Sequence, residues 1–185
     1  MKGIKSGGRY VVRRKYRSPH TLREAMQNEG ITTVLGAKII HVSQPSMSRM
    51  AAGKQDMQLE DAIRLAEQMD SPMLAMDLAN KTVRVTVPVI NGDGVIKEPL
   101  AMAIRAVPEM KEAIEAVNDS LDELTTPTAK VHDSSDPRNA VNQLLDVALY
   151  ANNTVAFMCE EYDWSMQELL ENREKEWRRQ GIVGD

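Results

Sequence analysis

The chain of 185 residues is poor in cysteine, in aromatic residues and in long apolar runs. Its single cysteine, Cys159, excludes an intramolecular disulfide and favours a reducing, cytoplasmic location. Aromatic residues make up only 4% of the chain, so a core must be built from aliphatic side chains and the 12 methionines, which suits small packed helices. No apolar run approaches the roughly 20 residues of a membrane span, and the basic N-terminus lacks the apolar segment of an export signal. No membrane partner is therefore expected.

Charge is distributed unevenly along the chain, although the net charge is only −4. Residues 1–84 carry 14 Lys and Arg against 8 Asp and Glu, a net charge of +6. Residues 85–185 carry 9 Lys and Arg against 19 Asp and Glu, a net charge of −10. A basic half joined to an acidic half predicts a polyanionic partner for the first half and a different role for the second.

The first 17 residues are predicted to form a flexible basic arm. They contain seven Lys and Arg, no acidic residue, and three glycines within the first eight positions. Such an arm can lie along phosphates or enter a minor groove. A disordered terminus without a function, derived in part from a cloning vector at residues 1–8, is the alternative. The arm's candidate DNA contacts are Arg13, Arg14, Lys15 and Arg17.

Residues 18–81 carry the boundary signals of five short helices, which predicts one domain. Ser and Thr at a helix start cap free N–H groups, proline is tolerated in a first turn, and glycine commonly ends a helix. The predicted helices begin near Ser18-Pro19, Thr32, Ser43, Met57 and Ser71, and the third helix is expected to end at Gly53.

The remainder is predicted to be an extended linker or small hairpin over residues 82–98, followed by a helical region over residues 99–185. Pro88 argues against an interior strand in the linker. The predicted helices of the second region are Leu100–Leu124, broken or kinked near Pro108, then Arg138–Tyr162, and a last helix from Ser165 to Trp177 with Glu168 completing a capping box. The expected fold class is therefore mainly all-α.

The third predicted helix, in the stretch "VSQPSMSRMAAGK" at Val42–Lys54, has an unusually polar outer face. Met47 and Met50 are spaced to hold it against a core. Gln44 can hydrogen-bond an adenine edge and Arg49 a guanine edge, each through two bonds, while serine hydroxyls can reach a base or a phosphate. These residue types are typical of a helix that enters the major groove of DNA.

The longer stretch "GAKIIHVSQPSMSRMAAGKQDMQLEDAIRLAEQM" resembles the lambda-repressor-like, XRE-type helix-turn-helix domain of phage and prophage regulators. The matching positions are Ala37, Ser43-Gln44, Ser48-Arg49 and Gly53-Lys54. The resemblance implies that Gln44, Pro45 and Arg49 face bases and that Lys54 faces the DNA backbone. Gly36, His41 and Pro45 depart from the usual pattern, so the base sequence recognised is left open. The candidate DNA contacts in this domain are Lys38, Ser43, Gln44, Pro45, Ser46, Ser48, Arg49 and Lys54.

The expected function is sequence-specific DNA binding by a transcriptional regulator. A single helix-turn-helix contacts few base pairs, so a homo-oligomer formed through the acidic C-terminal helices is expected to read two half-sites on double-stranded DNA. Binding of a peptide, protein or small effector is the alternative role for that half. Two other classes remain: a protein-interaction module such as an antitoxin or anti-repressor, and a nuclease or recombination accessory factor, which the lack of a carboxylate cluster disfavours.

No catalytic, metal or cofactor site is expected from the sequence. The three histidines are scattered without ligand partners at metal-binding spacing. Cys159 lies among apolar neighbours and is expected to be a buried small residue rather than a nucleophile. The chain is therefore not expected to be an enzyme.

Overall fold

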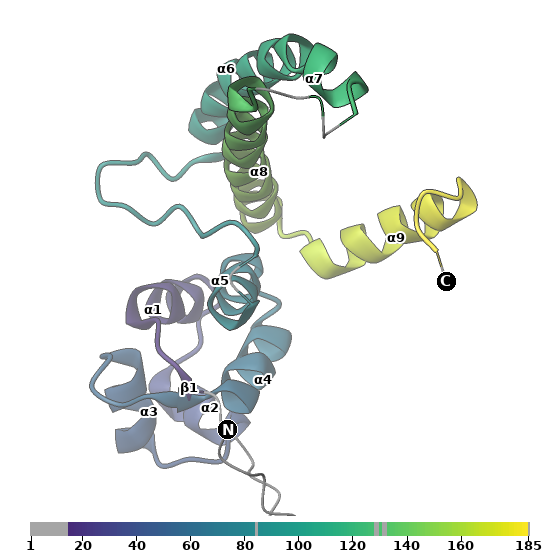
Figure 1. The fold of residues 1–185 in the computed structure, drawn as a ribbon. Helices are drawn as coiled ribbons and strands as arrows, with labels where there is room; N and C mark the ends of the chain where they lie inside the picture. Colours follow the sequence, from purple (N-terminus) through teal and green to yellow (C-terminus); the bar gives the residue numbers. More distant parts are fainter. Residues whose placement is uncertain (1–14, 84, 128–129, 131–132, 185) are drawn as a thin grey trace, which may run out of the picture.

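The computed structural model describes residues 15–83, 85–127, 130 and 133–184, and these residues are mainly helical (Figure 1). We call residues 15–83 the head. The head contains strands β1 (Lys15–Tyr16) and β2 (Met57–Gln58) and helices α1 (Pro19–Asn28), α2 (Thr33–Ile39), α3 (Gln44–Ala51), α4 (Leu59–Met69) and α5 (Pro72–Val83). The C-terminal part contains α6 (Pro99–Asp119), α7 (Leu121–Thr125), α8 (Ser135–Tyr162) and α9 (Met166–Arg179). The expected mainly all-α fold class is confirmed.

Local capping explains where several helices begin and end. Thr32, Ser43 and Ser165 each accept a hydrogen bond from a backbone N–H of the first helical turn, as their side chains allow. Gly53 follows α3 with a φ of +68°, a conformation that glycine adopts without strain. Asp70 ends α4 in the left-handed region with a φ of +45°. These expected helix boundaries are therefore confirmed to within a few residues.

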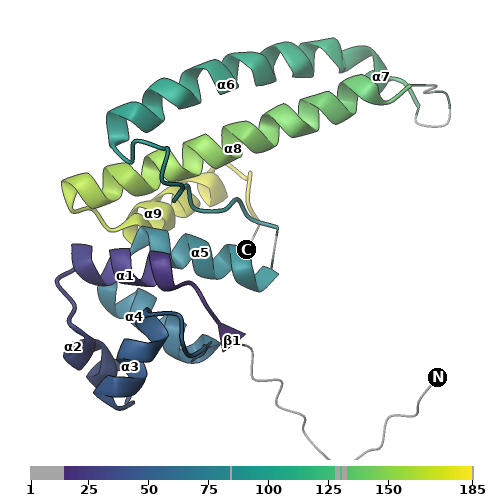
Figure 2. The ribbon, with the colours of Figure 1, turned by 90° about the vertical axis from the view of Figure 1, so that its left-hand side faces the viewer.

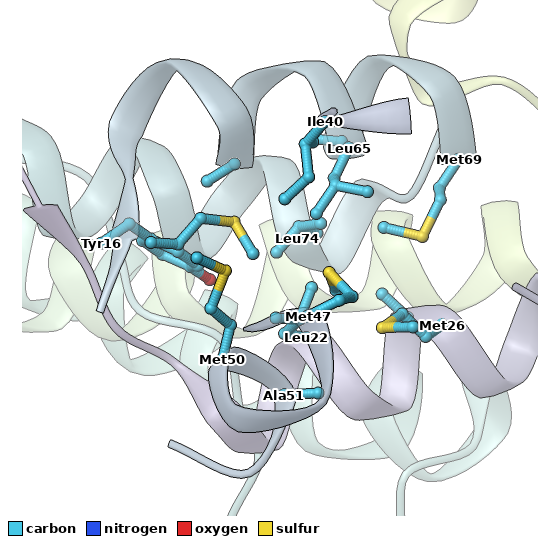
Figure 3. Close-up of a cluster of buried hydrophobic side chains, with 14 of the residues drawn as sticks. Tyr16, Leu22, Met26, Ile40, Met47, Met50, Ala51, Leu65, Met69 and Leu74 are labelled. Carbon is cyan, nitrogen blue, oxygen red and sulfur yellow. The ribbon is translucent and has the colours of Figure 1, made fainter. Parts of the chain in front are cut away.

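The core of the head is built largely from methionine and small aliphatic side chains (Figure 3). Met47, Leu65 and Leu74 are fully buried at its centre, from α3, α4 and α5 respectively. Methionine suits this core because its unbranched side chain fills irregular gaps between short helices. The packed core fixes α3 on the remaining helices and leaves its opposite face exposed.

The folded head begins before residue 18, because the end of the predicted arm pairs with the rest of the domain. Lys15 and Tyr16 form β1, which runs antiparallel to Met57–Gln58 of β2. The Tyr16 side chain is buried, and its hydroxyl donates a hydrogen bond to Asp77 Oδ2 at 2.6 Å. Residues 15–17 are therefore part of the head and not of a flexible arm. Arg13 and Arg14 lie outside the described residues.

The described part of the linker, residues 85–98, contains no strand, so the hairpin alternative is not found there. The linker is held against α8 by one buried amide. Asn153 accepts a hydrogen bond from the Ile90 N–H at 2.8 Å and donates one to the Pro88 carbonyl at 3.0 Å. Val89, Ile90 and Val95 also pack against a small apolar cluster. The described residues of this segment form neither a helix nor a strand, and the segment is anchored to α8 by side-chain contacts.

The C-terminal part is an antiparallel pair, α6 and α8, with α7 at their connection (Figure 2). Of the break or kink expected near Pro108, the break is wrong, because α6 runs without interruption from Pro99 to Asp119. Pro108 lies on the exposed side of the helix, where water can hydrogen-bond the carbonyl that the missing N–H leaves unpaired. The helix instead ends at Ser120, whose buried hydroxyl donates to the Val117 carbonyl at 2.8 Å. α8 begins at Ser135, three residues earlier than expected.

The head contacts the C-terminal part through an apolar cluster with an acidic border. Met73 of α5 packs with Met102, Ala156 and Phe157 of the C-terminal helices. Beside them, Glu160 of α8 faces Asn28 of α1, with the two side chains 3.5 Å apart from Nδ2 to Oε2. Burial, together with the nearby Glu29 and Glu24 carboxylates, raises the pKa of Glu160 from 4.5 to about 7.

We expect this contact to become less stable as the pH rises from 4.5 through 7. Because the folded state raises the pKa of Glu160, it binds the proton more tightly than the unfolded state, and this stabilisation is lost above pH 7. Glu160→Gln should therefore raise the free energy of unfolding by about 1–2 kcal/mol at pH 8, after solvent screening is allowed for, and change it little at pH 4.5. Thermal unfolding at both pH values measures this. An equal effect of Glu161→Gln, at the exposed neighbouring position, would contradict it.

Candidate nucleic-acid interface

α2 and α3 are joined by a turn of four residues whose geometry is unusual at one position. His41 adopts a φ of +54°, in the left-handed region that glycine prefers and that histidine enters more readily than most residues. Its side chain is exposed. The backbone therefore accommodates His41 at this position, and the turn brings α2 and α3 into direct contact.

A close approach between α2 and α3 keeps the apolar side of α3 inside. A Cβ added at Gly36 of α2 would lie 3.4 Å from Met47 Cε and 3.5 Å from Met26 Cε. These are ordinary van der Waals distances, so the position has room for a methyl group beside the flexible ends of the two methionine side chains. Because Met47 and Met50 are buried on one side, the polar residues of α3 face outward.

The outward face of α3 carries a hydrogen-bonded network centred on Arg49. The Ser46 N–H donates to Ser43 Oγ at 3.3 Å, and the two serine hydroxyl oxygens lie 2.9 Å apart. Arg49 Nη2 donates to Ser46 Oγ at 3.1 Å, and Arg49 Nε donates to Gln55 Oε1 at 3.0 Å. A guanidinium has five N–H donors, so these two bonds orient it and leave donors for an external acceptor. The exposed Arg49 side chain is therefore held in place before any partner binds.

Gln44, at the start of α3, is also held by the neighbouring helix. Its Nε2 donates to Thr33 Oγ1 of α2 at 3.2 Å, and the side chain remains exposed. Gln55 and Thr33 were not among the residues expected at this site. In the sequence, Gln55 is the polar residue after Gly53-Lys54, and Thr33 is the second Thr of the "TT" pair at the start of α2. Neither position indicates which distant side chain the residue contacts.

Basic side chains lie at the C-terminal end of α3. Arg17 Nη2 donates to the Gly53 carbonyl at 2.6 Å, and Lys54 follows directly in an exposed position. Lys15 Nζ and Arg17 Nε lie 3.7 and 4.0 Å from the Asp56 carboxylate, while both basic side chains remain 65% exposed. Two of the residues assigned to the arm therefore belong to the border of α3, with their charge partly offset by Asp56.

The structure brings most of the expected DNA contacts onto one surface. The expected contacts on α3 and at its borders are exposed, except for Ser46, which is half-buried. These residues are Ser43, Gln44, Pro45, Ser46, Ser48, Arg49 and Lys54. Lys38, on α2, is also exposed. We call the surface formed by α3, Lys54 and Gln55 the α3 face.

In the described part of the chain, metal-ligating residue types form no metal centre. No group of three or more His, Cys, Asp and Glu residues there could hold a metal ion. Cys159 is buried, and that burial raises the pKa of its thiol, which makes it a poor nucleophile. No described helix is both long and apolar enough to cross a membrane.

Comparison with known proteins adds no assignment. No protein-family model matches the chain, and no curated protein and no solved structure matches it either. The interpretation of the α3 face therefore depends on its own geometry and chemistry.

Proposed function

We propose that the protein is a sequence-specific, DNA-binding transcriptional regulator that inserts α3 into the major groove. In this proposal α2 and α3 form a helix-turn-helix of the lambda-repressor-like type. The observation that carries it is the Arg49 network, because an exposed arginine held by Ser46 and Gln55 is oriented for a specific acceptor. Holding an arginine side chain on two acceptors costs conformational entropy, which an arginine that is only solvated does not lose.

The chemistry of the α3 face suits a base edge at its centre and phosphates around it. Arg49 can donate two hydrogen bonds to guanine O6 and N7, and Gln44 can pair with adenine N6 and N7. Lys38 on α2 and the basic residues Lys54 and Arg17 at the end of α3 would contact phosphates, which position the head without reading sequence. Pro45 offers no backbone donor, so its contribution to base preference is apolar contact.

A protein-interaction module is the second candidate function, and one cleft favours it. Helices α4, α5 and α9 line a cleft of about 490 Å³, with Met76, Met166 and Leu170 among its apolar lining residues. Glu67, Asp70, Glu171 and Glu174 line the same cleft. A lining of apolar and acidic side chains fits a basic amphipathic peptide. Such a peptide would be an effector of the regulator or, in the second function, the main partner.

Replacing Arg49 with alanine is expected to weaken binding to the cognate site by about 1–3 kcal/mol and to relax preference at one base pair. The bidentate bond to guanine is lost, whereas phosphate contacts stay. Binding should be measured on the site selected from random DNA by the full chain, and on variants of that site. Arg105→Ala on α6 removes the same charge away from the α3 face and should leave base preference unchanged. If Arg49→Ala lost the same affinity on every DNA sequence, Arg49 would contact a phosphate and not a base.

Deleting residues 1–14 is expected to flatten the salt dependence of DNA binding. This segment contains five Lys and Arg, and each phosphate contact contributes about 0.9 to the slope of log K against log salt concentration. The deletion stops before Tyr16, so the core of the head is kept. Titrations between about 50 and 200 mM salt measure the slope for both chains. An unchanged slope would show that the arm makes no phosphate contact.

A further inference from the structure

The contact between α6 and α8 is made mainly by small side chains. Ala106, Ala113 and Ala116 of α6 are buried, as are Ser120 at its end and Ala140 of α8. Alanine allows two helices to approach closely but removes little apolar area from water. The pair therefore has a small apolar interior, and its large apolar side chains must lie elsewhere.

Most of the exposed large apolar side chains of α6 form a heptad pattern on the outside of the pair, while Ile104, which is 64% exposed, lies outside the row. Successive positions are spaced alternately by three and four residues, which is the repeat of a helix that packs along another helix. Leu100, Ile114 and Leu124 are 71%, 62% and 63% exposed. We call this row the α6 seam, and it continues onto α7: Leu100, Ala103, Val107, Met110, Ile114, Val117, Leu121 and Leu124.

α8 carries a second row with the same repeat. It consists of Val141, Leu144, Ala148, Ala151 and Val155, and we call it the α8 seam. Leu144 is 49% exposed. Met110, Ile114, Val117 and Leu144 together line one groove of about 410 Å³. Because side chains of both seams line this groove, the two seams border one continuous surface, which we call the hairpin face.

The directions of the seams fit a four-helix arrangement. Each residue of an α-helix is rotated by about 100° from the one before, so the α6 seam, whose residues directly follow the buried alanines, points about 100° away from the alanine row that contacts α8. A helix in a four-helix bundle contacts two neighbours in such separate directions. Within the described part of the chain, each helix therefore lacks a neighbour on its seam side. The contacts of α8 with α5 and with the linker are made by other residues, among them Asn153, Ala156 and Phe157.

The size of the hairpin face matches a standard protein interface. Nine large apolar side chains of the two seams are between 42% and 71% exposed. Since such a side chain presents on the order of 100 Å² of apolar surface, the face offers roughly 500 Å². A standard interface buries about 800 Å² per partner, somewhat more than half of it apolar. A helical pair of equal length would cover the face.

We propose that a second copy of this chain covers the hairpin face, so that two α6–α8 pairs form a four-helix bundle about a two-fold axis. A second copy supplies the same heptad repeat, the same length and the same missing neighbours, which makes the face self-complementary. Figure 2 shows α6 on the far side of α8 from the head, so the head does not obstruct a partner at α6. This inference deepens the proposed function, since it identifies what supplies the second head.

The test measures the oligomeric state of the full chain without DNA. Light scattering and sedimentation over a range of concentrations should give a dimer. Ile114→Glu places a charge in the bundle interior once in each copy and should raise the dimer Kd at least about 100-fold. Ile182→Glu is the matched control, because Ile182 is 68% exposed against 62% for Ile114 but lies beyond α9. It should leave the dimer Kd unchanged.

A second variant and a fold measurement keep the test decisive. Leu144→Glu on α8 should weaken the dimer as Ile114→Glu does, and circular dichroism should show that both variants remain helical. A monomeric wild-type chain, or a dimer that both variants leave intact, would overturn the inference. A monomer whose Arg49→Ala variant still loses base preference would refute only the bundle. A dimer without sequence-specific DNA binding would refute only the proposed function.

Discussion

A fragment of residues 1–83 is expected to bind a two-half-site operator about 10²–10⁴-fold more weakly than the full chain. The fragment keeps the arm, the α3 face and the core of the head, whose buried side chains come from residues 16–78. It lacks α6 and α8 and so cannot join two heads. In the full chain the second half-site contact becomes an intramolecular event, which adds affinity without any new contact.

The measurement compares both chains on two DNA molecules. The operator is the one selected by the full chain from random DNA, and the second duplex carries only one of its half-sites. On the single half-site the two chains should bind with similar affinity, because each uses one head. The affinity of the full chain should be higher for the operator than for the single half-site, whereas the affinity of the fragment should be similar for both. Equal affinity of both chains for the operator would assign the C-terminal helices to an effector or partner instead.

Local sequence signals predicted much of the helical framework. Ser43 and Ser165 cap helices because a serine oxygen can accept a bond from an N–H two or three positions on, and such a contact depends only on neighbouring residues. The same holds for Gly53, where the chain needs a positive φ. These features were predictable because their physics is contained within a few residues.

Features that depend on distant residues were not predictable. Tyr16 lies in a stretch rich in Lys and Arg, so composition favoured a flexible arm. Its burial depends on β2 and on Asp77, which is 61 residues away along the chain. The local sequence at Pro108 likewise predicts a helix break. The packing of α6 on α8 places Pro108 on the exposed side of the helix, where the helix continues. In both cases tertiary contacts outweighed the local signal.

The candidate site divides in the same way. The exposed polar face of α3 followed from helical periodicity, because Met47 and Met50 had to turn inward. The partners that hold Arg49 and Gln44, which are Gln55 and Thr33, could not be predicted, since side-chain hydrogen bonds across a turn need coordinates. The sequence thus indicated which residues face outward, whereas the structure showed how two of them are held.

Replacing Tyr16 with alanine is expected to lower the free energy of unfolding by about 3–5 kcal/mol. The change leaves a cavity where the ring packs in the core, which is the main cost for a buried aromatic residue. It also removes the donor to Asp77, a carboxylate that is itself buried and has Lys81 Nζ 3.4 Å away. A buried acceptor without its partner adds to the loss. Urea unfolding of the full chain measures the change.

Two further substitutions separate the contributions of the Tyr16 ring and hydroxyl. Tyr16→Phe keeps the ring and should cost only about 1–3 kcal/mol, the penalty for the acceptor left on Asp77. Tyr162→Ala is the control, because Tyr162 is 58% exposed and stacks only on Trp164, so its loss should cost less than about 1.5 kcal/mol. If Tyr16→Ala proved no more costly than Tyr162→Ala, β1 would contribute nothing to the stability of the head. The larger cost is expected for Tyr16 because its side chain, in β1, is part of the buried core. The composition of the surrounding stretch, taken alone, is typical of a flexible terminus.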